Sequence, residues 1–550
     1  MEAQLGDVRQ TLRDFIDQQK KIHRDDKDSE CLRALRVVDP QYDMMEIEGK
    51  KDALLDDAYR WVLDTNEYAA FTNWSDDEPD QSPCRLLWIK GPAGTGKTML
   101  LIGIIRELSN RPFMLTPKLS YFFCQGANTT LNNATAILRS LIWMLLVQQP
   151  YLISHLQEAY KVSGPPLFTE KAAFYTLSAI FQDMLKDARL SSVYFIVDAL
   201  DECDQAEPGL ERLVNLISMS LTFSDKVKWL VSSRPEVDLK PKLKNSDALG
   251  DLLELDAQKL EAPVKAYISH KLTTLRAKDG YDEGVLAEVS KVVYERAMNT
   301  FLWVSLVFEE LHSVEGWYAV KIIEQIPPGL SKLYEHMMTR IEKGKMSDPK
   351  YCKNVLVAAS LAYRPLTLSE LAIAAGLPSK ITPETIVKKC GLFFTTKKKT
   401  VYLIHQSAKD YLEANSMSGL QQGGAVQGHA DISRCLLSAM SKLRKNIYAQ
   451  LHVGSKSEDI TVPSPDPLEG LRYPCVYWAR HVCQVGLQLD PQRNGAQLYD
   501  QVYQFLQEHF LHWLEALGWI GKSSEGILAI FSLEALYPVG PIYNMPRNYD

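Results

Sequence analysis

One segment limits the possible folds of this chain more than any other. The residues Gly91-Pro92-Ala93-Gly94-Thr95-Gly96-Lys97-Thr98 match the pattern G-x-x-x-x-G-K-[ST] in full, between an apolar run, Leu86–Ile89, and a helical pattern, Met99–Leu108. Glycines let backbone N–H groups surround phosphate oxygens without a Cβ clash, and the start of a helix favours a bound anion. The sequence therefore predicts a phosphate-binding loop in which Lys97 reaches the β- and γ-phosphates and Thr98 ligates Mg²⁺.

A second motif supplies the acidic residues that nucleotide hydrolysis needs. The apolar run Tyr194–Val197 ends in Asp198, and Asp201 and Glu202 follow shortly after it. We expect Asp198 to hold Mg²⁺, and Asp201 and Glu202 to act on the attacking water. An isolated acidic cluster is usually a solvated turn, but the preceding strand pattern and the phosphate loop favour the functional interpretation.

A third motif follows another strand pattern. Val227–Ser232 is apolar for most of its length and ends in Ser233-Arg234-Pro235. Arg234 at this strand end can reach a γ-phosphate and report its presence, and the alternative is a surface ion pair. Two more strand patterns, Leu119–Cys124 and Leu252–Leu255, alternate with helical stretches. The alternation predicts an α/β P-loop NTPase core, a parallel sheet with helices on both faces.

Helical patterns dominate the rest of the chain. Residues 258–345 are predicted to be helical, with a strong helix at Ala297–Leu311, and residues 471–535 are helical and rich in aromatic side chains. Within 416–470, a Gly-rich stretch and a Pro-rich stretch are typical of linkers or exposed loops. A narrow apolar stripe in residues 1–30 predicts one amphipathic helix that docks on the body of the protein, and the alternative is a coiled coil for self-association.

Residues 346–415 have a pattern of their own. They are predicted to form helices followed by a hairpin with strands at Leu392–Thr396 and Thr400–Ile404, turned by Lys397-Lys398-Lys399. A basic wing of this kind can bind DNA in a winged helix, but a charged hairpin turn is the commoner explanation. The net charge of −7 also gives no electrostatic reason to expect a nucleic acid partner.

Composition places the chain among intracellular proteins. Hydrophobic residues make up 46% of its 550 residues, which is enough for several buried cores. The nine cysteines show no metal-binding spacing, as in reduced, cytoplasmic proteins. The residues from Met1 on lack the basic-then-apolar pattern of a secretory signal, and no apolar run approaches the roughly 20 residues of a membrane-spanning helix, so we expect a cytoplasmic protein.

The three motifs, in this order, resemble those of the NACHT family of STAND P-loop NTPases, and among these the fungal NOD-like receptor proteins. The form Asp198-Ala199-Leu200-Asp201-Glu202, with a small residue after the first Asp, is fairly specific to this family. The resemblance starts at Cys31–Arg36, includes Thr300–Val304 and Leu403–Leu412, and reaches Phe505–Leu533, so it covers most of the chain.

The resemblance implies a sequence of domains. We expect five parts: an N-terminal helical segment and linker at 1–48, a NACHT P-loop NTPase core at 49–256, a helical lid at 257–345, a winged helix at 346–415, and a linker with a helical C-terminal segment at 416–550. Receptors of this family carry an N-terminal effector domain and C-terminal repeats. Here we expect these modules to be short or missing, as in a shortened regulator or a truncated gene product.

The resemblance also implies a mechanism. The family binds a nucleotide and Mg²⁺, is closed when a diphosphate is bound, and opens to form a homo-oligomer when a triphosphate replaces it. A winged-helix histidine contacts the β-phosphate of the bound diphosphate, and His405 matches that position. No [NT]-K-x-D motif is present, but some members accept GTP, so both ATP and GTP remain candidates. The family suggests non-self recognition or programmed cell death.

Two other functions compete with this switch. A constitutive P-loop ATPase motor or remodeller uses the same phosphate loop, although the chain has no ABC-type signature and no evident helicase motif. A nucleotide-independent scaffold is the third reading, in which the fold is kept without its chemistry. We expect a slow nucleoside-triphosphatase that serves as a switch.

Overall fold

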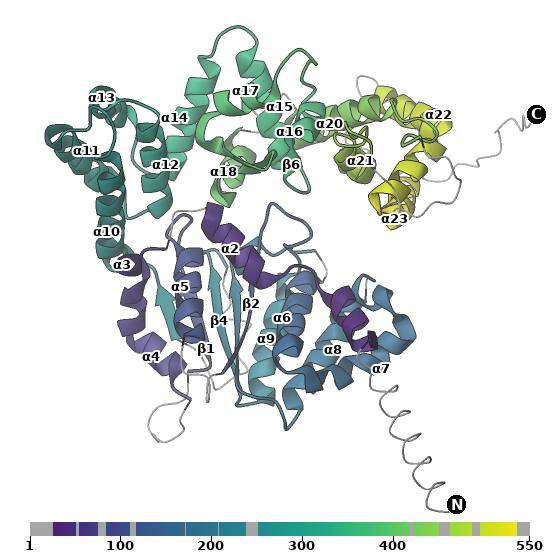
Figure 1. Cartoon of the computed structure of the whole chain (residues 1–550), viewed down its shortest axis with the longest axis horizontal. Helices are drawn as coiled ribbons and strands as arrows, with labels where there is room; N and C mark the ends of the chain where they lie inside the picture. Colours follow the sequence, from purple (N-terminus) through teal and green to yellow (C-terminus); the bar gives the residue numbers. More distant parts are fainter. Residues whose placement is uncertain are drawn as a thin grey trace, which may run out of the picture. The chain divides into compact units, whose positions relative to one another are not determined.

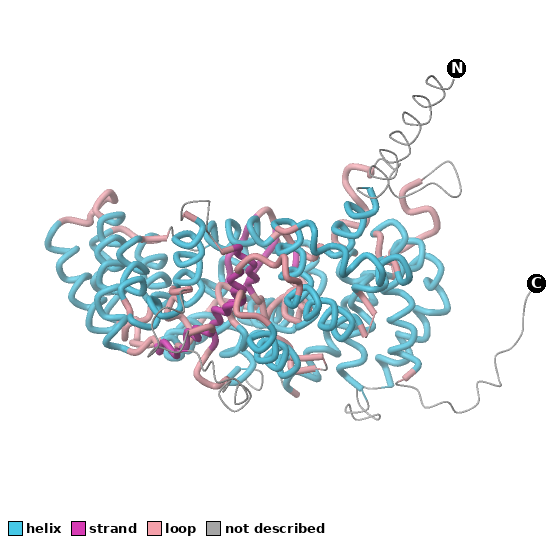
Figure 2. Tube along the Cα trace, turned by 90° about the horizontal axis from the view of Figure 1, so that it is seen from below, coloured by secondary structure: helices cyan, strands magenta, loops and turns pink. Residues whose placement is uncertain are grey.

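The computed structural model describes residues 26–50, 54–74, 84–110, 117–170, 172–206, 208–237, 251–416, 423–449, 462–486 and 496–535. The chain divides into two compact units, Met1–Gly329 and Leu330–Asp550. Helices account for most of the described residues (Figure 2). The finer division into five parts stays a prediction.

A parallel sheet of five strands organises the first unit. Its strands lie in the order β2-β3-β4-β1-β5, and every pair runs parallel. The bounds are β1 Leu86–Lys90, β2 Lys118–Phe123, β3 Val193–Asp198, β4 Val227–Ser233 and β5 Asp251–Glu254. All five predicted strands are therefore confirmed, with small shifts at their ends. Because the strands are parallel, their carboxyl ends meet at one edge of the sheet.

Helices cover both faces of this sheet, as predicted (Figure 1). Successive residues of a strand point to opposite faces, and β4 shows both contacts: Lys228 meets one helical layer and Trp229 the other. Lys228 donates from Nζ to the carbonyl oxygen of Phe71 at 2.8 Å. Trp229 donates from Nε1 to the Ser220 hydroxyl at 2.8 Å. The helices are α4 Asn66–Thr72 and α5 Lys97–Ser109 on one face, and α6 Ala134–Gln148, α8 Ala173–Lys186 and α9 Leu210–Phe223 on the other.

The two layers differ in how they are held. On the α9 side, Trp229 stacks on Phe195 with ring centroids 4.9 Å apart, inside a large apolar cluster. On the α4 side, the buried ammonium of Lys228 caps the carboxyl end of α4 and lies 4.8 Å from the ring centroid of Trp74. A cation at a helix carboxyl end is stabilising, which explains how a lysine fits inside the sheet layer.

The remaining helices of the first unit precede the sheet in sequence, follow it or, at Ser154–Ser163, lie between β2 and β3. Residues 26–35 form a helix whose last carbonyls bind α6, since Arg139 donates to the Leu35 oxygen at 3.0 Å and to the Ala34 oxygen at 2.8 Å. The apolar stripe behind the predicted docking helix lies within residues 1–25, outside the described residues, so that docking stays a prediction. The others are α2 Pro40–Lys50, α3 Asp56–Tyr59, α7 Ser154–Ser163, α10 Ala257–Leu275, α11 Glu283–Arg296, α12 Phe301–His312 and α13 Gly316–Gln325.

The helix predicted at Ala297–Leu311 begins too early. The chain leaves α11 at Arg296, and α12 starts only at Phe301. Between them, Met298 and Asn299 adopt left-handed backbone angles, with φ of 47° and 54°. Asn299 also donates from its side chain to the Ala257 oxygen at 2.7 Å. Left-handed residues end a right-handed helix, so the apolar periodicity hid a break.

The second unit contains a small antiparallel sheet in the order β6-β8-β7. The predicted hairpin is confirmed, but both strands are shorter and Lys397 belongs to a strand. Lys398 and Lys399 alone form the turn, with φ of 47° and 67°, as a two-residue hairpin turn requires. The short strand β6 was not predicted. The elements are α14 Leu330–Glu342, α15 Asp348–Leu361, β6 Leu366–Thr367, α16 Leu368–Ala374, α17 Pro383–Lys389, β7 Phe394–Lys397, β8 Thr400–Leu403 and α18 Gln406–Tyr411.

The described part of the Gly-rich stretch, 423–428, was predicted wrongly as a linker or exposed loop, and Gly419 lies outside the described residues. Gly424–Met440 forms the helix α20, which packs against α21, and Gly428 is buried. The described part of the Pro-rich stretch, 462–467, is a mostly exposed loop. The predicted C-terminal helices are α21 Arg472–Val485, α22 Ala496–Ile520 and α23 Ser523–Glu534. Among the described residues, no helix is long and apolar enough to cross a membrane.

Replacement of Trp229 tests the core of the first unit. Trp229→Ala removes a fully buried ring and its hydrogen bond to Ser220, so we expect the free energy of unfolding to fall by about 3–5 kcal/mol. The control is Tyr318→Ala, an exposed aromatic of the same unit, with an expected change within about 0.5 kcal/mol. Urea unfolding followed by circular dichroism measures both. Equal effects of the two variants would contradict this core.

Candidate functional site

The phosphate loop joins β1 to α5 with two glycines in left-handed conformations. Gly94 has φ of 77° and Gly96 has φ of 88°, where a side chain would be strained. Gly96 is the residue before α5, so the helix predicted at Met99–Leu108 begins two residues earlier, with Lys97 and Thr98 in its first turn. Lys97 donates from Nζ to the carbonyl oxygens of Gly91 and Pro92, at 2.6 and 2.9 Å. The loop is therefore folded around the lysine ammonium.

Asp198 is buried at the carboxyl end of β3 and is oriented by β4. The Ser232 hydroxyl donates to Asp198 Oδ1 at 2.5 Å and accepts the N–H of Ala199 at 2.8 Å. Ala199 has φ of 53°. A β-branched or bulky residue is disfavoured in this left-handed conformation, which accounts for the small residue after Asp198. Ser232 was not predicted from the sequence, although it directly precedes the Ser233-Arg234 motif.

Asp201 and Arg234 form an ion pair. Arg234 Nε lies 3.0 Å from Asp201 Oδ2, and the Arg234 backbone N–H donates to Oδ1 at 3.0 Å. Burial raises the pKa of Asp201, while Arg234 and then Lys97 act to lower it. Asp201, one of the residues predicted to act on water, thus holds Arg234 at the site. The side chains of both residues are mostly buried, so this is not an ion pair on the protein surface.

Glu202 is held by the loop after β2. Its Oε2 accepts the Gly126 N–H at 2.7 Å. Burial raises the pKa of Glu202 from 4.5 to about 7; the Gly126 N–H opposes the shift, and the neighbouring carboxylates of Asp201 and Asp198 add to it. A carboxyl group with this pKa changes protonation near neutral pH, as a general base requires. Gly126 carries no sequence signal that predicts this contact.

The basic and acidic groups of the site affect one another. Burial lowers the pKa of Lys97, and the carboxylates of Asp201 and Asp198 partly offset this. The structure therefore brings Lys97, Asp198, Asp201, Glu202 and Arg234 together at the carboxyl edge of the sheet. The strand order explains how, because β4 lies between β1 and β3.

A helix start from later in the chain contacts the phosphate loop. The Leu302 backbone N–H donates to the Gly94 oxygen at 3.2 Å. The ring of Phe301 lies so close to Gly96 that an added Cβ would be 3.1 Å from it. Phe301 also packs on Tyr267 of α10, with centroids 5.5 Å apart. The sequence predicted a helix here, but its contact with the loop was missed.

His405 lies in the second unit, immediately before α18. Its Nδ1 accepts the Ser407 backbone N–H at 3.1 Å and lies 2.9 Å from the Ser407 hydroxyl oxygen. That hydroxyl is 3.0 Å from the Tyr334 hydroxyl. Because Nδ1 accepts the helix-capping bond, the neutral ring carries its proton on Nε2, where it is a donor. The contact with a nucleotide phosphate stays a prediction.

The residues present fit Mg²⁺. This ion takes oxygen ligands, keeps several waters and needs few protein groups. Ser232 uses only Oδ1 of Asp198, which leaves Oδ2 for a metal or its water, and Thr98 supplies a hydroxyl at the helix start. Within the described ranges there is no cluster of three or more His, Cys, Asp or Glu that would form a protein-only metal site.

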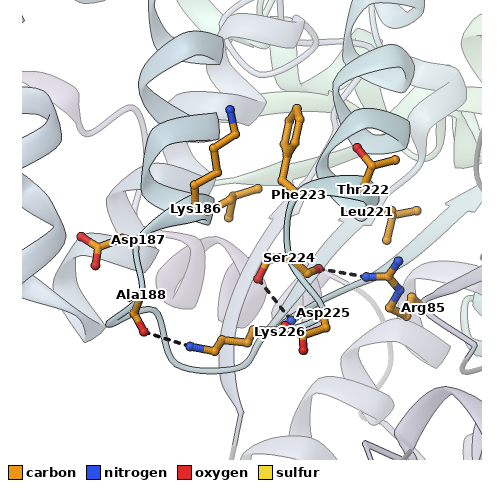
Figure 3. A pocket seen from close by; sticks show the side chains of 11 residues that line it. Arg85, Lys186, Asp187, Ala188, Leu221, Thr222, Phe223, Ser224, Asp225 and Lys226 are labelled. Atoms are coloured by element: carbon orange, nitrogen blue, oxygen red, sulfur yellow. Dashed lines mark hydrogen bonds between the residues drawn. The ribbon is translucent and has the colours of Figure 1, made fainter.

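A hollow of about 270 Å³ lies at the other edge of the sheet, near the amino ends of β1 and β4. Its cations are engaged: Arg85 donates to the Ser224 oxygen at 2.9 Å and Lys226 to the Ala188 oxygen at 3.0 Å (Figure 3). These bonds satisfy carbonyls that follow α8 and α9. We assign the hollow a structural role and no part in the nucleotide site.

The pKa of Glu202 gives a pH test. Its raised pKa favours the protonated form on folding, so its favourable contribution is complete below about 4.5 and is lost as the pH rises through about 7. Glu202→Gln removes this dependence. We expect the free energy of unfolding of the wild type, relative to this variant, to decrease between pH 5 and 8 in metal-free buffer. A difference that stays constant with pH would be inconsistent with the raised pKa.

Comparisons with solved structures give weak similarities. A Walker-type ATPase of Pyrococcus abyssi is 14% identical, covers 60% of this chain and 91% of its own, and has a TM-score of 0.28. Cdc6p of Pyrobaculum aerophilum is 13% identical, covers 64% and 90%, and has a TM-score of 0.28. The assignment of the α/β P-loop core therefore depends on the strand order and the loop described above.

Sequence comparisons are more informative. The family model for the N-terminal region of nephrocystin 3 matches residues 57–234. The vegetative incompatibility protein HET-E-1 of Podospora anserina is 37% identical over 534 residues, which are 93% of this chain and 38% of that protein. The chain thus spans well under half the length of this relative. Together with the loop, the acidic motif and Arg234, these matches show that the chain belongs to the NACHT-type P-loop NTPases of fungal NOD-like receptor proteins.

Proposed function

We propose that this chain is a nucleotide-controlled signalling switch. It binds ATP or GTP with Mg²⁺ at the loop Gly91–Thr98, and slow hydrolysis returns it to a closed state with ADP or GDP. The observation that carries the proposal is the convergence of Lys97, Asp198, Glu202 and Arg234 at one edge of the sheet. These are the charges needed to bind a triphosphate and act on water.

Nucleotide binding is favoured by what Lys97 contacts. Its ammonium donates to two loop carbonyls, and charged phosphate oxygens are stronger acceptors than neutral carbonyls. A phosphate next to the ammonium also restores the charged form that burial disfavours. Bound Mg²⁺ would neutralise phosphate charge, held by Thr98 and by Asp198 in the orientation set by Ser232.

Slow hydrolysis follows from the contacts that Arg234 and Glu202 make within the protein. Arg234 is paired with Asp201, so it must leave that partner to reach a γ-phosphate. Glu202 is only partly ionised near neutral pH. A site that must rearrange before each turnover suits a switch better than a constitutive motor, and a nucleotide-independent scaffold has no need of such a cluster. Fast multiple turnover stimulated by a polymer would favour the motor instead.

The second unit supplies a candidate lock. The ring nitrogen of His405 that does not cap α18, Nε2, is a donor in the neutral ring, and a donor of this kind suits the β-phosphate of a bound diphosphate. Release of this bond by nucleotide exchange would free the second unit for homo-oligomerisation. The name of the curated relative, a vegetative incompatibility protein, supports non-self recognition leading to programmed cell death as the biological setting.

Lys97→Ala tests the nucleotide site. Loss of the charged contacts should weaken binding of a fluorescent ATP or GTP analogue about 10- to 150-fold, since bonds to charged groups contribute about 1.5–3 kcal/mol. Lys186→Ala, at the opposite edge of the sheet, is the control and should leave the dissociation constant within about twofold. Unchanged affinity in Lys97→Ala would count against the site.

His405→Ala tests the lock. The variant should release bound diphosphate several-fold faster and form oligomers at lower triphosphate concentration, because one phosphate contact of the closed state is gone. Stopped-flow displacement and light scattering measure the two effects, with the exposed His270→Ala as control. A variant that exchanges nucleotide at the wild-type rate and stays monomeric would exclude the lock.

A further inference from the structure

The helix α2 is connected to the hydrolytic end of the sheet through a buried hydrogen bond. Asp43 of α2 is buried, with 6% of its surface exposed. Its Oδ1 accepts a hydrogen bond from the side-chain nitrogen of Gln125 at 2.9 Å. The helix itself packs on β2, the strand that ends just before Gln125 (Figure 1). A segment that precedes the sheet in sequence therefore contacts the loop after β2.

That loop contacts Glu202. Gln125 is followed by Gly126, whose N–H donates to Glu202 Oε2 at 2.7 Å. The loop is closed on itself, because the Gln125 oxygen accepts the Asn128 N–H at 2.9 Å. It is also joined to the chain after Glu202, where the Asp204 N–H donates to the Asn132 oxygen at 2.6 Å. Because Gln125 and Gly126 are joined by one peptide bond, a shift of Gln125 also moves the Gly126 N–H.

A second tether of α2 goes elsewhere and offers a control. Glu48, near the end of α2, forms an ion pair with Arg106 of α5 at 2.6 Å. The Arg106 side chain is half-exposed, so this pair is expected to contribute little energy. It holds the same helix without touching the loop after β2.

We propose that Asp43 and Gln125 are positioning residues that hold the Gly126 N–H on Glu202, and so couple α2 to the hydrolytic carboxylate. Loosening of α2 withdraws this donor and slows hydrolysis. Because the coupling is reciprocal, a change at Glu202 also alters the stability of α2. The inference rests on the proposed function for its catalytic consequence. Under this proposal, the segment that precedes the NTPase core regulates hydrolysis in the core.

The test reverses the polarity of the buried bond. Gln125→Glu places a second carboxylate against Asp43, so the pair repels. The double variant Asp43→Asn with Gln125→Glu restores one amide and one carboxylate, with donor and acceptor exchanged. We expect kcat for nucleotide hydrolysis to fall about tenfold in the single variant and to recover to within about threefold in the double variant. The dissociation constant for nucleotide should stay within about twofold in both.

The control is Arg106→Ala, which removes the other tether and should leave kcat within about twofold. A second readout, amide hydrogen exchange of the nucleotide-free full chain, should rise in α2 and at Gly126 for Gln125→Glu and return in the double variant. This readout also confirms that the variants fold.

Three results would each overturn the coupling. The Gln125→Glu variant could keep the wild-type kcat and the wild-type amide hydrogen exchange, or the double variant could fail to recover. Arg106→Ala could also lose as much kcat as Gln125→Glu. A wild-type protein that neither binds nor hydrolyses nucleotide contradicts the proposed function instead. The exchange measurement then decides the coupling by itself, because it needs no nucleotide.

Discussion

The parallel pairing of β4 between β1 and β3 is the constraint on which the site depends. β1 carries the phosphate loop and β3 carries Asp198, and the two strands do not touch. β4 fills the space between them, so its last residues meet groups from both sides. On the β3 side Ser232 orients Asp198, and on the β1 side the Ser233 carbonyl oxygen accepts the Gly91 N–H at 3.2 Å. With another strand between β1 and β3, the same motifs would not form one cluster.

The charges of this cluster are engaged with partners from within the protein. Lys97 binds carbonyls of its own loop, Arg234 binds Asp201, and Glu202 binds the Gly126 N–H. Each contact gives a buried charge or polar group a partner, which lowers the cost of burial. In the proposed switch, Lys97 and Arg234 exchange these partners for a triphosphate, whereas the Gly126 N–H stays on Glu202. Regulation can therefore act on these contacts, and α2 reaches one of them through Gln125.

The sequence was most informative where one physical requirement dominates. Buried parallel strands need continuous apolar runs, so all five strands were placed, and a phosphate loop needs glycines at left-handed positions such as Gly94 and Gly96. Strand order and tertiary contacts leave no local pattern, which is why Ser232, Gly126 and Phe301 were missed. Local signals also misled where packing outweighed them. Glycines usually mark loops, but Gly428 is buried in α20, and the apolar run that begins at Phe301 concealed the break at Met298.

The central claim is that the protein is a switch set by its bound nucleotide. The most direct test is mass spectrometry of nucleotide released from the purified full chain, together with the size of the chain in diphosphate and in a non-hydrolysable triphosphate with Mg²⁺. The account predicts a nucleoside diphosphate released in near-stoichiometric amount from a monomer, and a larger assembly with the triphosphate analogue. Protein that carries no nucleotide, binds neither form and keeps one size in both would contradict it.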